Sequence, residues 1–306
     1  MLGSAEFMRY ILEFIPAWLM AQLLRWSPRP VARAIAMGVA SLVLTLHGRL
    51  RRTGLRNLEL AHPDMPVEER ERILRELFRS LGRLLADVPK FPTWTRNNAA
   101  QLAQYDGLEN YLAAAERGRG VLLLTAHIGG WEVGSFFHSL MGHTMHIVVR
   151  DLDNPYLDRY IRHLRCLHGN QTHDKDTFAR GLLAAMKKGE TVGVLMDTNM
   201  TPPQGVFVNF FGIPACTASG VARVAQHTGA AVVPAYTVWD EKLGRYRVCF
   251  EPALPTVNTG DAEADAVTNT QTYTTALEST IRRYPEQWLW VHRRWKTRPN
   301  GEPGLY

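Results

Sequence analysis

The order of short apolar runs and helical segments is the feature of this sequence that most constrains its fold. Residues 120–126 form a continuous apolar run of strand length, without the polar alternation of a half-exposed strand. Three further runs of this kind follow, at residues 146–149, 192–196 and 231–238. Helical patterns separate the runs, at residues 131–140, 155–167, 176–188 and 218–228. This alternation predicts an α/β fold with a central, mainly parallel sheet flanked by helices.

Four more elements are predicted outside this alternating region. Residues 66–85 carry Ile and Leu at a helical period with Glu and Arg on the opposite face, which indicates an amphipathic helix. A short helix is expected at 107–117, an antiparallel edge strand at 246–250 and a late helix at 265–284. Three cysteines lie far apart without a CxxC pair among the 306 residues, which argues against a disulfide framework, a structural zinc site and an oxidising compartment.

The positive charge of the chain is concentrated near its N-terminus. The net charge is +6, and residues 1–57 contain eight Arg against Glu6 and Glu13, so the rest of the chain is balanced. The apolar runs at 10–24 and 34–46 lie between these arginines, which favours association with an anionic membrane surface. The alternative is two core helices, and a nucleic-acid-binding module is not indicated because stacking aromatic residues are missing from the pattern.

The chain is therefore divided into three parts. Residues 1–7 precede a second Met and look like a vector-derived extension, and the segment shows no signal peptide cleavage site. Residues 8–57 are expected to form an N-terminal helical membrane-associating segment, and 58–306 the α/β domain.

A histidine follows the first buried strand, at the edge of the sheet where such folds place their chemistry. His127 enters a double-glycine turn with Gly130, and Glu132 follows five positions after the histidine. A carboxylate at this spacing could orient a general-base imidazole. The alternative is a buried histidine with a helix-capping acid, because an HxxxxD or HxxxxE pattern arises about once by chance in a chain of this composition.

Polar residues that follow the next strands lie at the same edge. Arg150 could hold a phosphate or stabilise an oxyanion, although an ion pair with Asp151 or Asp153 is the alternative. Asp197 and Asn199 could belong to the site or to a turn, and Arg165 could simply favour a helix C-terminus. A serine elbow, a phosphate-binding loop, a dinucleotide fingerprint and an HExxH helix are missing, and no metal-ligand set emerges.

Together these segments resemble the lipid A late acyltransferases, part of the lysophospholipid acyltransferase superfamily. The matching segments run in order through residues 10–306: Leu-Leu-Thr-Ala-His127-Ile-Gly-Gly-Trp-Glu132, Arg150 with Asn154-Pro155, Leu-Met-Asp197-Thr-Asn199, residues 205–215, Thr228-Gly-Ala230, and residues 284–296 with Arg298-Pro299. The resemblance implies a glycerolipid acyltransferase-like fold. It also implies transfer of a fatty acyl chain from acyl carrier protein, or from acyl-CoA, to a hydroxyl of a membrane lipid at the cytoplasmic face of the bacterial inner membrane.

The resemblance also implies roles for individual residues. His127 would be the general base and Glu132 would orient it, with no acyl-enzyme and no cofactor beyond the acyl thioester. Arg150 and Arg165 would bind phosphates of the acceptor or of the carrier, Asp197 and Asn199 would lie near the acceptor, and Gly130 would let the substrate approach.

Two regions leave alternatives open. Members of the family often carry Arg-Pro where this chain has Arg150-Asp151, in a region that contributes to acceptor choice, so lysophospholipids and other glycolipids are alternative acceptors. The cations and tryptophans of residues 288–298 would line a phosphate or carrier site, or would form an interfacial belt. A non-catalytic protein that binds acidic lipids and a metal-dependent hydrolase are further alternatives.

Overall fold

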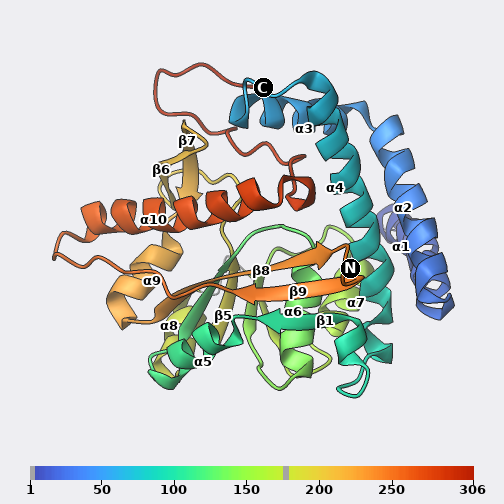
Figure 1. The fold of residues 1–306 in the computed structure, drawn as a ribbon, viewed down its shortest axis with the longest axis horizontal. Helices are drawn as coiled ribbons and strands as arrows, with labels where there is room; N and C mark the ends of the chain where they lie inside the picture. Colours follow the sequence, from blue (N-terminus) through green and yellow to red (C-terminus); the bar gives the residue numbers. More distant parts are fainter. Residues whose placement is uncertain (1–3, 175–178) are drawn as a thin grey trace.

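A seven-stranded sheet forms the centre of the molecule (Figure 1). The computed structural model describes residues 4–174 and 179–306. The strand order is β1-β9-β8-β2-β5-β3-β4, and the five strands from β8 to β4 are parallel to one another. The strands are β1 (Ala103–Asp106), β2 (Val121–Thr125), β3 (His146–Val149), β4 (Gln171–Asp174), β5 (Thr191–Leu195), β8 (Ala231–Asp240) and β9 (Arg245–Phe250). Strand β9 pairs with β8 antiparallel and with β1 parallel.

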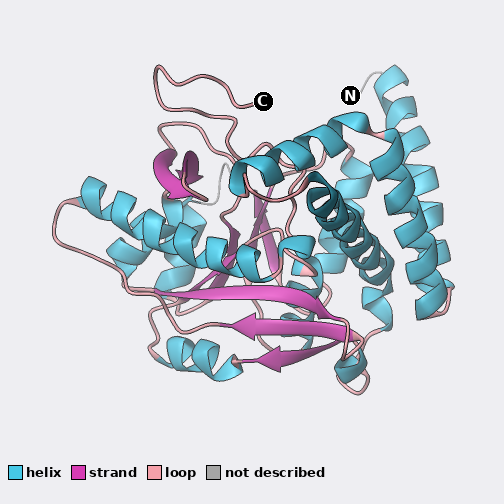
Figure 2. Cartoon of the chain, turned by 45° about the horizontal axis from the view of Figure 1, so that its top comes forward, coloured by secondary structure: helices cyan, strands magenta, loops and turns pink. Residues whose placement is uncertain are grey.

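Helices cover both sides of these strands (Figure 2). Leu122 and Leu124 of β2 belong to a core with α4 (Val67–Asp87), α8 (Ala179–Lys187), α9 (Gly220–Thr228) and α10 (Ala262–Arg283). Val121 and Leu123 belong to the opposite core, with α5 (Leu108–Glu116), α6 (Trp131–Leu140) and α7 (Pro155–Arg165). Both faces of β2 are therefore buried, which explains why its sequence is continuously apolar.

The N-terminal helices form a layer at one flank of the molecule. Helices α1 (Ser4–Trp26) and α2 (Arg29–Leu46) lie side by side there, and α3 (Gly48–Ala61) leads to α4 (Figures 1 and 2). By length and composition both α1 and α2 could cross a membrane, with mean hydropathies of 1.2 for residues 6–26 and 1.4 for 29–46. The boundary expected between residues 57 and 58 lies inside α3.

The mainly parallel sheet flanked by helices confirms the predicted fold class. The strand predicted at 246–250 is antiparallel as expected, but it is not an edge strand, because β1 pairs with its outer side. The prediction passed over β1, β4 and the hairpin of β6 (Gly205–Phe210) with β7 (Ile213–Ala218), whose sequences contain polar residues or short apolar pieces. The helix predicted from 176 begins in residues that lie outside the described part, and its remainder is α8.

Candidate active site

The site lies where β2 and β5 end, at their carboxyl ends. His127 follows β2 by two residues, and Asp197 follows the neighbouring parallel strand β5 by two residues. Because the two strands pair in register, the two side chains come from equivalent places on adjacent strands. The Nδ1 atom of His127 lies 2.9 Å from Oδ1 of Asp197, and the main-chain N–H of His127 donates to Oδ2 over 2.9 Å.

A tryptophan from the C-terminal segment completes the surroundings of the Asp197 carboxylate. Trp288 Nε1 donates to Oδ2 of Asp197 over 2.8 Å, and both side chains are buried. The segment around Trp288 also pairs with the chain at His127, since Gly129 N donates to Gln287 O and Leu289 N donates to His127 O. Sequence reasoning missed this role of Trp288, because nothing in the pattern links positions that lie 91 residues apart.

Charges around His127 favour its protonated form. Burial opposes the imidazolium, but the Asp197 carboxylate and, more weakly, Glu132 outweigh that effect, so the pKa of His127 lies above its ordinary value. Burial likewise opposes the carboxylate of Asp197, yet the His127 ring and the N–H donors hold the pKa of Asp197 below its usual range. Asp197 is therefore an anion that can orient the ring and stabilise its positive charge.

The carboxylate of Glu132 is held by Arg165 and not by the imidazole. Arg165 at the end of α7 donates from Nε to Oε2 of Glu132 over 2.8 Å and from a terminal nitrogen to Oε1. This bidentate pair is only 16–20% exposed. The structure thus corrects two expectations: Asp197, not Glu132, makes the hydrogen bond that orients His127, and the guanidinium of Arg165 is occupied by Glu132.

The double-glycine turn serves packing within the protein. A Cβ atom on Gly129, whose φ is +54°, would lie 2.3 Å from the carbonyl oxygen of Thr237. A Cβ atom on Gly130 would lie 2.6 Å from the ring of Tyr246. The space expected beside Gly130 for a substrate is therefore filled by Tyr246, and the glycines allow the turn to pack against β8 and β9.

The other two predicted residues take different positions. Arg150, directly after β3, is exposed and forms no ion pair in the part of the chain that the structure describes, since Asp151 pairs with Arg162. Asn199 is used within the protein: its N–H donates to His292 Nε2, and its side-chain amide donates to Thr297 Oγ1 and accepts from Thr297 N. Neither expectation describes Asn199, which joins the end of β5 to the C-terminal segment and does not make a local turn contact. Arg150 remains available to a ligand.

The tryptophans of residues 288–298 are interior residues. Trp288, Trp290 and Trp295 are at most 1% exposed, so an interfacial belt is excluded for them. Arg294 is equally buried and donates to Cys216 O and Thr217 Oγ1. Burial, partly offset by the Asp197 charge, lowers the pKa of Arg294 to about 10. Arg294 therefore supports the site from inside and cannot bind a carrier.

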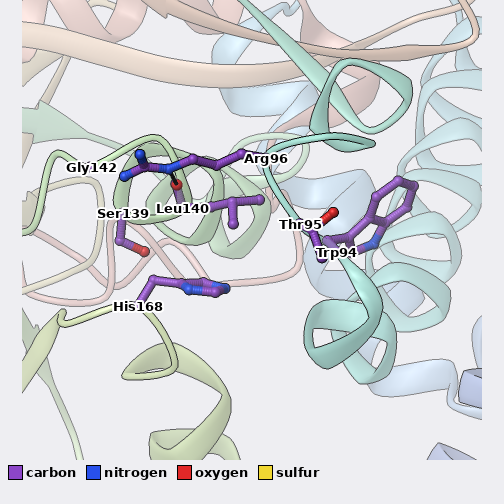
Figure 3. A pocket seen from close by; sticks show the side chains of 7 residues that line it. All are labelled: Trp94, Thr95, Arg96, Ser139, Leu140, Gly142 and His168. Atoms are coloured by element: carbon purple, nitrogen blue, oxygen red, sulfur yellow. Dashed lines mark hydrogen bonds between the residues drawn. The ribbon is translucent and has the colours of Figure 1, made fainter.

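A cavity of about 370 Å³ lies at the other end of α6 from the catalytic turn (Figure 3). Arg96 at its rim donates from Nε to Leu140 O over 2.9 Å. None of the predicted catalytic or substrate-binding residues lines it; the lining residues are Trp94, Thr95, Arg96, Ser139, Leu140, Gly142 and His168. Within residues 4–174 and 179–306, no group of three or more His, Cys, Asp or Glu side chains is arranged to hold a metal ion.

Comparison with known proteins identifies the family of the chain. The sequence profile of the family described as bacterial lipid A biosynthesis acyltransferase matches residues 4–297. The chain belongs to this acyltransferase family. The resemblance seen in the sequence is thus confirmed, and the chain is an acyltransferase.

Several curated members of the lipid A acyltransferase family match this chain over most of their length. The chain is 29% identical over 290 residues to the lipid A biosynthesis palmitoleoyltransferase of Escherichia coli strain K12, covering 94% of this chain and 91% of the relative. It is 30% identical to the lauroyltransferase of the same strain, over 94% of this chain and 92% of the relative. The myristoyltransferase of that strain is 24% identical, over 82% and 77% respectively. The names of these relatives specify different acyl chains, so the length of the acyl chain that this protein transfers has to be measured.

Proposed function

We propose that this acyltransferase moves a fatty acyl group from the thioester of acyl carrier protein to a hydroxyl of a lipid A precursor, with His127 as the general base. The observation that carries the proposal is the contact of His127 Nδ1 with Asp197 at the carboxyl edge of the sheet. Asp197 is ionised, so Nδ1 carries the hydrogen and Nε2 keeps its lone pair. Nε2 has no hydrogen-bond partner among the described residues, and the His127 side chain is 23% exposed.

The reaction then needs only one addition and one elimination. Nε2 of His127 accepts the proton of the acceptor hydroxyl while its oxygen attacks the thioester carbonyl carbon. The tetrahedral intermediate collapses, the carbon–sulfur bond breaks, and the imidazolium returns the proton to the leaving thiolate. The products are an O-acyl ester and the free thiol of the carrier. No acyl-enzyme forms, in keeping with a site that offers a base but no serine elbow.

Asp197 acts through His127 and is therefore a positioning residue. It holds the ring in the productive tautomer and stabilises the imidazolium that forms during attack. The Glu132–Arg165 pair lies close enough for its charges to affect the pKa of His127, Glu132 raising it and Arg165 lowering it. We assign this pair to tuning the basicity of the imidazole, and the free Arg150 to a phosphate of the acceptor or of the carrier.

An assay of transfer with labelled donors tests the proposal. Purified wild type and His127→Ala are offered acyl carrier protein thioester or acyl-CoA against a panel of a lipid A precursor, lysophospholipids and other glycolipids. Transfer to the lipid A precursor from the carrier thioester is expected, and His127→Ala should reduce it by roughly 10³-fold or more while vesicle binding is kept. Transfer only to a lysophospholipid would change the acceptor, and full activity of His127→Ala would remove the base from the mechanism.

A further inference from the structure

Helix α1 carries a stripe of large apolar side chains that no other described part of the chain covers. The stripe follows one helical face over the whole length of α1, and its members are 48–73% exposed: Met8, Leu12, Ile15, Leu19, Leu23 and Trp26. The end of α2 adds Leu42, Val43 and Leu46. We call these nine residues the apolar surface. Many large apolar side chains exposed on neighbouring helices of a folded protein indicate a membrane or protein partner.

Both ends of α1 are fixed to the α/β domain. Near its start, Asn154 Nδ2 donates to Tyr10 O over 2.9 Å and to Glu13 Oε2 over 3.0 Å. At its end, Lys90 Nζ donates to Arg25 O over 2.8 Å and to Ser27 O over 2.5 Å. Tyr10 and Arg25 are fifteen positions apart, which corresponds to about 22 Å of helix. A helix that crossed a bilayer would have to carry one of these ends to the other side, away from the domain.

Helix α2 is also fixed along its length. Three of its four buried residues are alanines, and a Cβ atom on Gly82 of α4 would lie 2.6 Å from the Cα of Met37. The backbones of α2 and α4 are thus in direct contact. Arg29 and Arg33 of α2 pair with Asp87 of α4, which is fully buried, over 3.0 and 2.8 Å. Pulling α2 into a bilayer would leave this carboxylate buried without its partners, which is strongly unfavourable.

Unpaired positive charge lies directly beside the apolar surface. Arg49 and Arg52, in the first turns of α3 after Leu46, are exposed and form no ion pair within the described residues. Trp18 and Trp26 of α1 are exposed as well. Apolar residues with neighbouring arginines and tryptophans match the region where acyl chains meet anionic head groups.

We infer that the apolar surface enters a single leaflet of an anionic phospholipid bilayer, with α1 and α2 lying along the membrane and the turn between them remaining on the aqueous side of the α/β domain. This inference refines the membrane association expected from the sequence and does not depend on the acyl-transfer step. Asn154, which holds α1, lies five residues after the end of β3, at the sheet edge where the β2 and β5 strands deliver His127 and Asp197. The membrane therefore lies beside the active-site edge, where an acceptor lipid can approach without leaving its leaflet.

The position of the turn tests the orientation. A single cysteine is introduced as Pro28→Cys in a Cys166→Ser background, whose two remaining cysteines are buried. The protein is bound to preformed sealed vesicles of phosphatidylethanolamine and phosphatidylglycerol, and a membrane-impermeant maleimide is added outside. Leu243→Cys, in the turn between β8 and β9, is the control for the outer side. Equal labelling of both cysteines is expected. Labelling of Pro28→Cys only after the vesicles are permeabilised would mean that α1 spans the bilayer and would overturn the inference.

Binding strength tests the surface itself. Leu12→Glu with Leu19→Glu should weaken binding to these vesicles by tenfold or more. Leu112→Glu, the same change at an exposed leucine of α5 on the other side of the molecule (Figure 1), should leave binding unchanged. Arg49→Gln with Arg52→Gln should weaken binding roughly thirtyfold on these vesicles but not on phosphatidylcholine vesicles. The matched control is Arg117→Gln with Arg119→Gln, two exposed arginines near α5. Unchanged vesicle binding by the Leu12→Glu, Leu19→Glu variant would show that the apolar surface does not bind the membrane. A wild-type dimer in sedimentation that this variant dissociates would assign the surface to contact between two copies of the chain.

Discussion

The contact between Asp197 and His127 predicts whether Nε2 of His127 can accept a proton. Oδ2 of Asp197 already accepts from His127 N and Trp288 Nε1, so Asp197→Asn would keep its carbonyl oxygen there and turn its NH₂ group toward His127 Nδ1. The imidazole would then carry its hydrogen on Nε2 and could not accept a proton. We expect kcat to fall by roughly 10⁴-fold, as for other wrong-tautomer variants, with folding retained.

Steady-state kinetics and a thermal unfolding curve of the same preparation check this expectation. A matched control is Asp174→Asn, which makes the same change at the end of β4, away from the imidazole. A folded Asp197→Asn protein whose kcat stayed within about tenfold of wild type would show that His127 does not act as the base.

The raised pKa of His127 sets the acid limit of activity. The base must be neutral, so activity is lost as the pH falls through the pKa of the imidazole, and we expect the acid limb of the kcat/KM profile to lie above the ordinary value of 6.5. Glu132→Gln removes a charge that raises this pKa and leaves Arg165 without its partner. The acid limb of Glu132→Gln should therefore move to lower pH. An acid limb of the kcat/KM profile that stayed at the same pH, or moved to higher pH, would contradict the role assigned to Glu132.

The candidate residues could be predicted from the sequence to a limited extent. His127 and Asp197 follow apolar strands, so the edge rule for parallel sheets brought both to the site. The hydrogen-bond partner of the imidazole could not be predicted. The sequence pattern alone does not distinguish Glu132, five residues away along the chain, from Asp197, which follows the neighbouring strand. Only the three-dimensional course of α7, which brings Arg165 to Glu132, decides between them.

At the scale of elements, the turn that starts α6 depends on the absence of a side chain at Gly130. Gly130→Ala would press its methyl group into the ring of Tyr246, which is fully buried and cannot move away easily. We expect a loss of kcat of about tenfold or more and a lower melting temperature. Gly220→Ala is the control, since a Cβ atom there would meet nothing within 4 Å. Equal behaviour of the two variants would mean that the packing against Tyr246 is unimportant.

The attachment of α2 to α4 gives a prediction about stability. Asp87→Asn removes the charge that Arg29 and Arg33 share in a buried place, and we expect it to lower the free energy of unfolding by about 3–5 kcal/mol. The comparison is Glu263→Gln, which breaks the exposed pair with Arg223 and should leave the free energy of unfolding nearly unchanged, because solvent screens the two charges. Urea denaturation of both variants measures the difference. A small effect of Asp87→Asn would place α2 outside the cooperative unit.

Helices and strands with a clear hydrophobic pattern could be predicted from the sequence. The helix at 131–140 was predicted with the ends that the structure gives it, and β3 at 146–149 likewise. Strand β1 was missed because its sequence, Ala-Gln-Tyr-Asp, has no apolar run; pairing with β9 stabilises it instead. The apolar runs at 10–24 and 34–46 were predicted to be helical, and both lie in helices. Only tertiary contacts could show that each helix has one buried side and one exposed apolar side.

At the scale of the whole molecule, the site depends on chain regions that are far apart. Trp288 joins the C-terminal segment to Asp197 after β5, and its indole N–H has one acceptor there. Trp288→Phe keeps the ring packing but removes the donor. We expect a loss of about 1–3 kcal/mol in the free energy of unfolding and a lower kcat, because a buried carboxylate loses one of its donors. Trp295→Phe is the matched control, because the indole nitrogen of Trp295 has no hydrogen-bond partner among the described residues. The same loss in both variants would argue against the role given to Trp288.

The order of these regions in the sequence determines the order in which they are synthesised. The segment around Trp288 contacts the chain at His127, whereas the last residue of the apolar surface is Leu46. At about 5–20 residues per second, translation of the intervening residues takes on the order of tens of seconds. The residues of the apolar surface are therefore synthesised well before the segment that completes the surroundings of His127 and Asp197. If the apolar surface binds a membrane as we infer, a growing chain carries its membrane-binding residues before its site is complete.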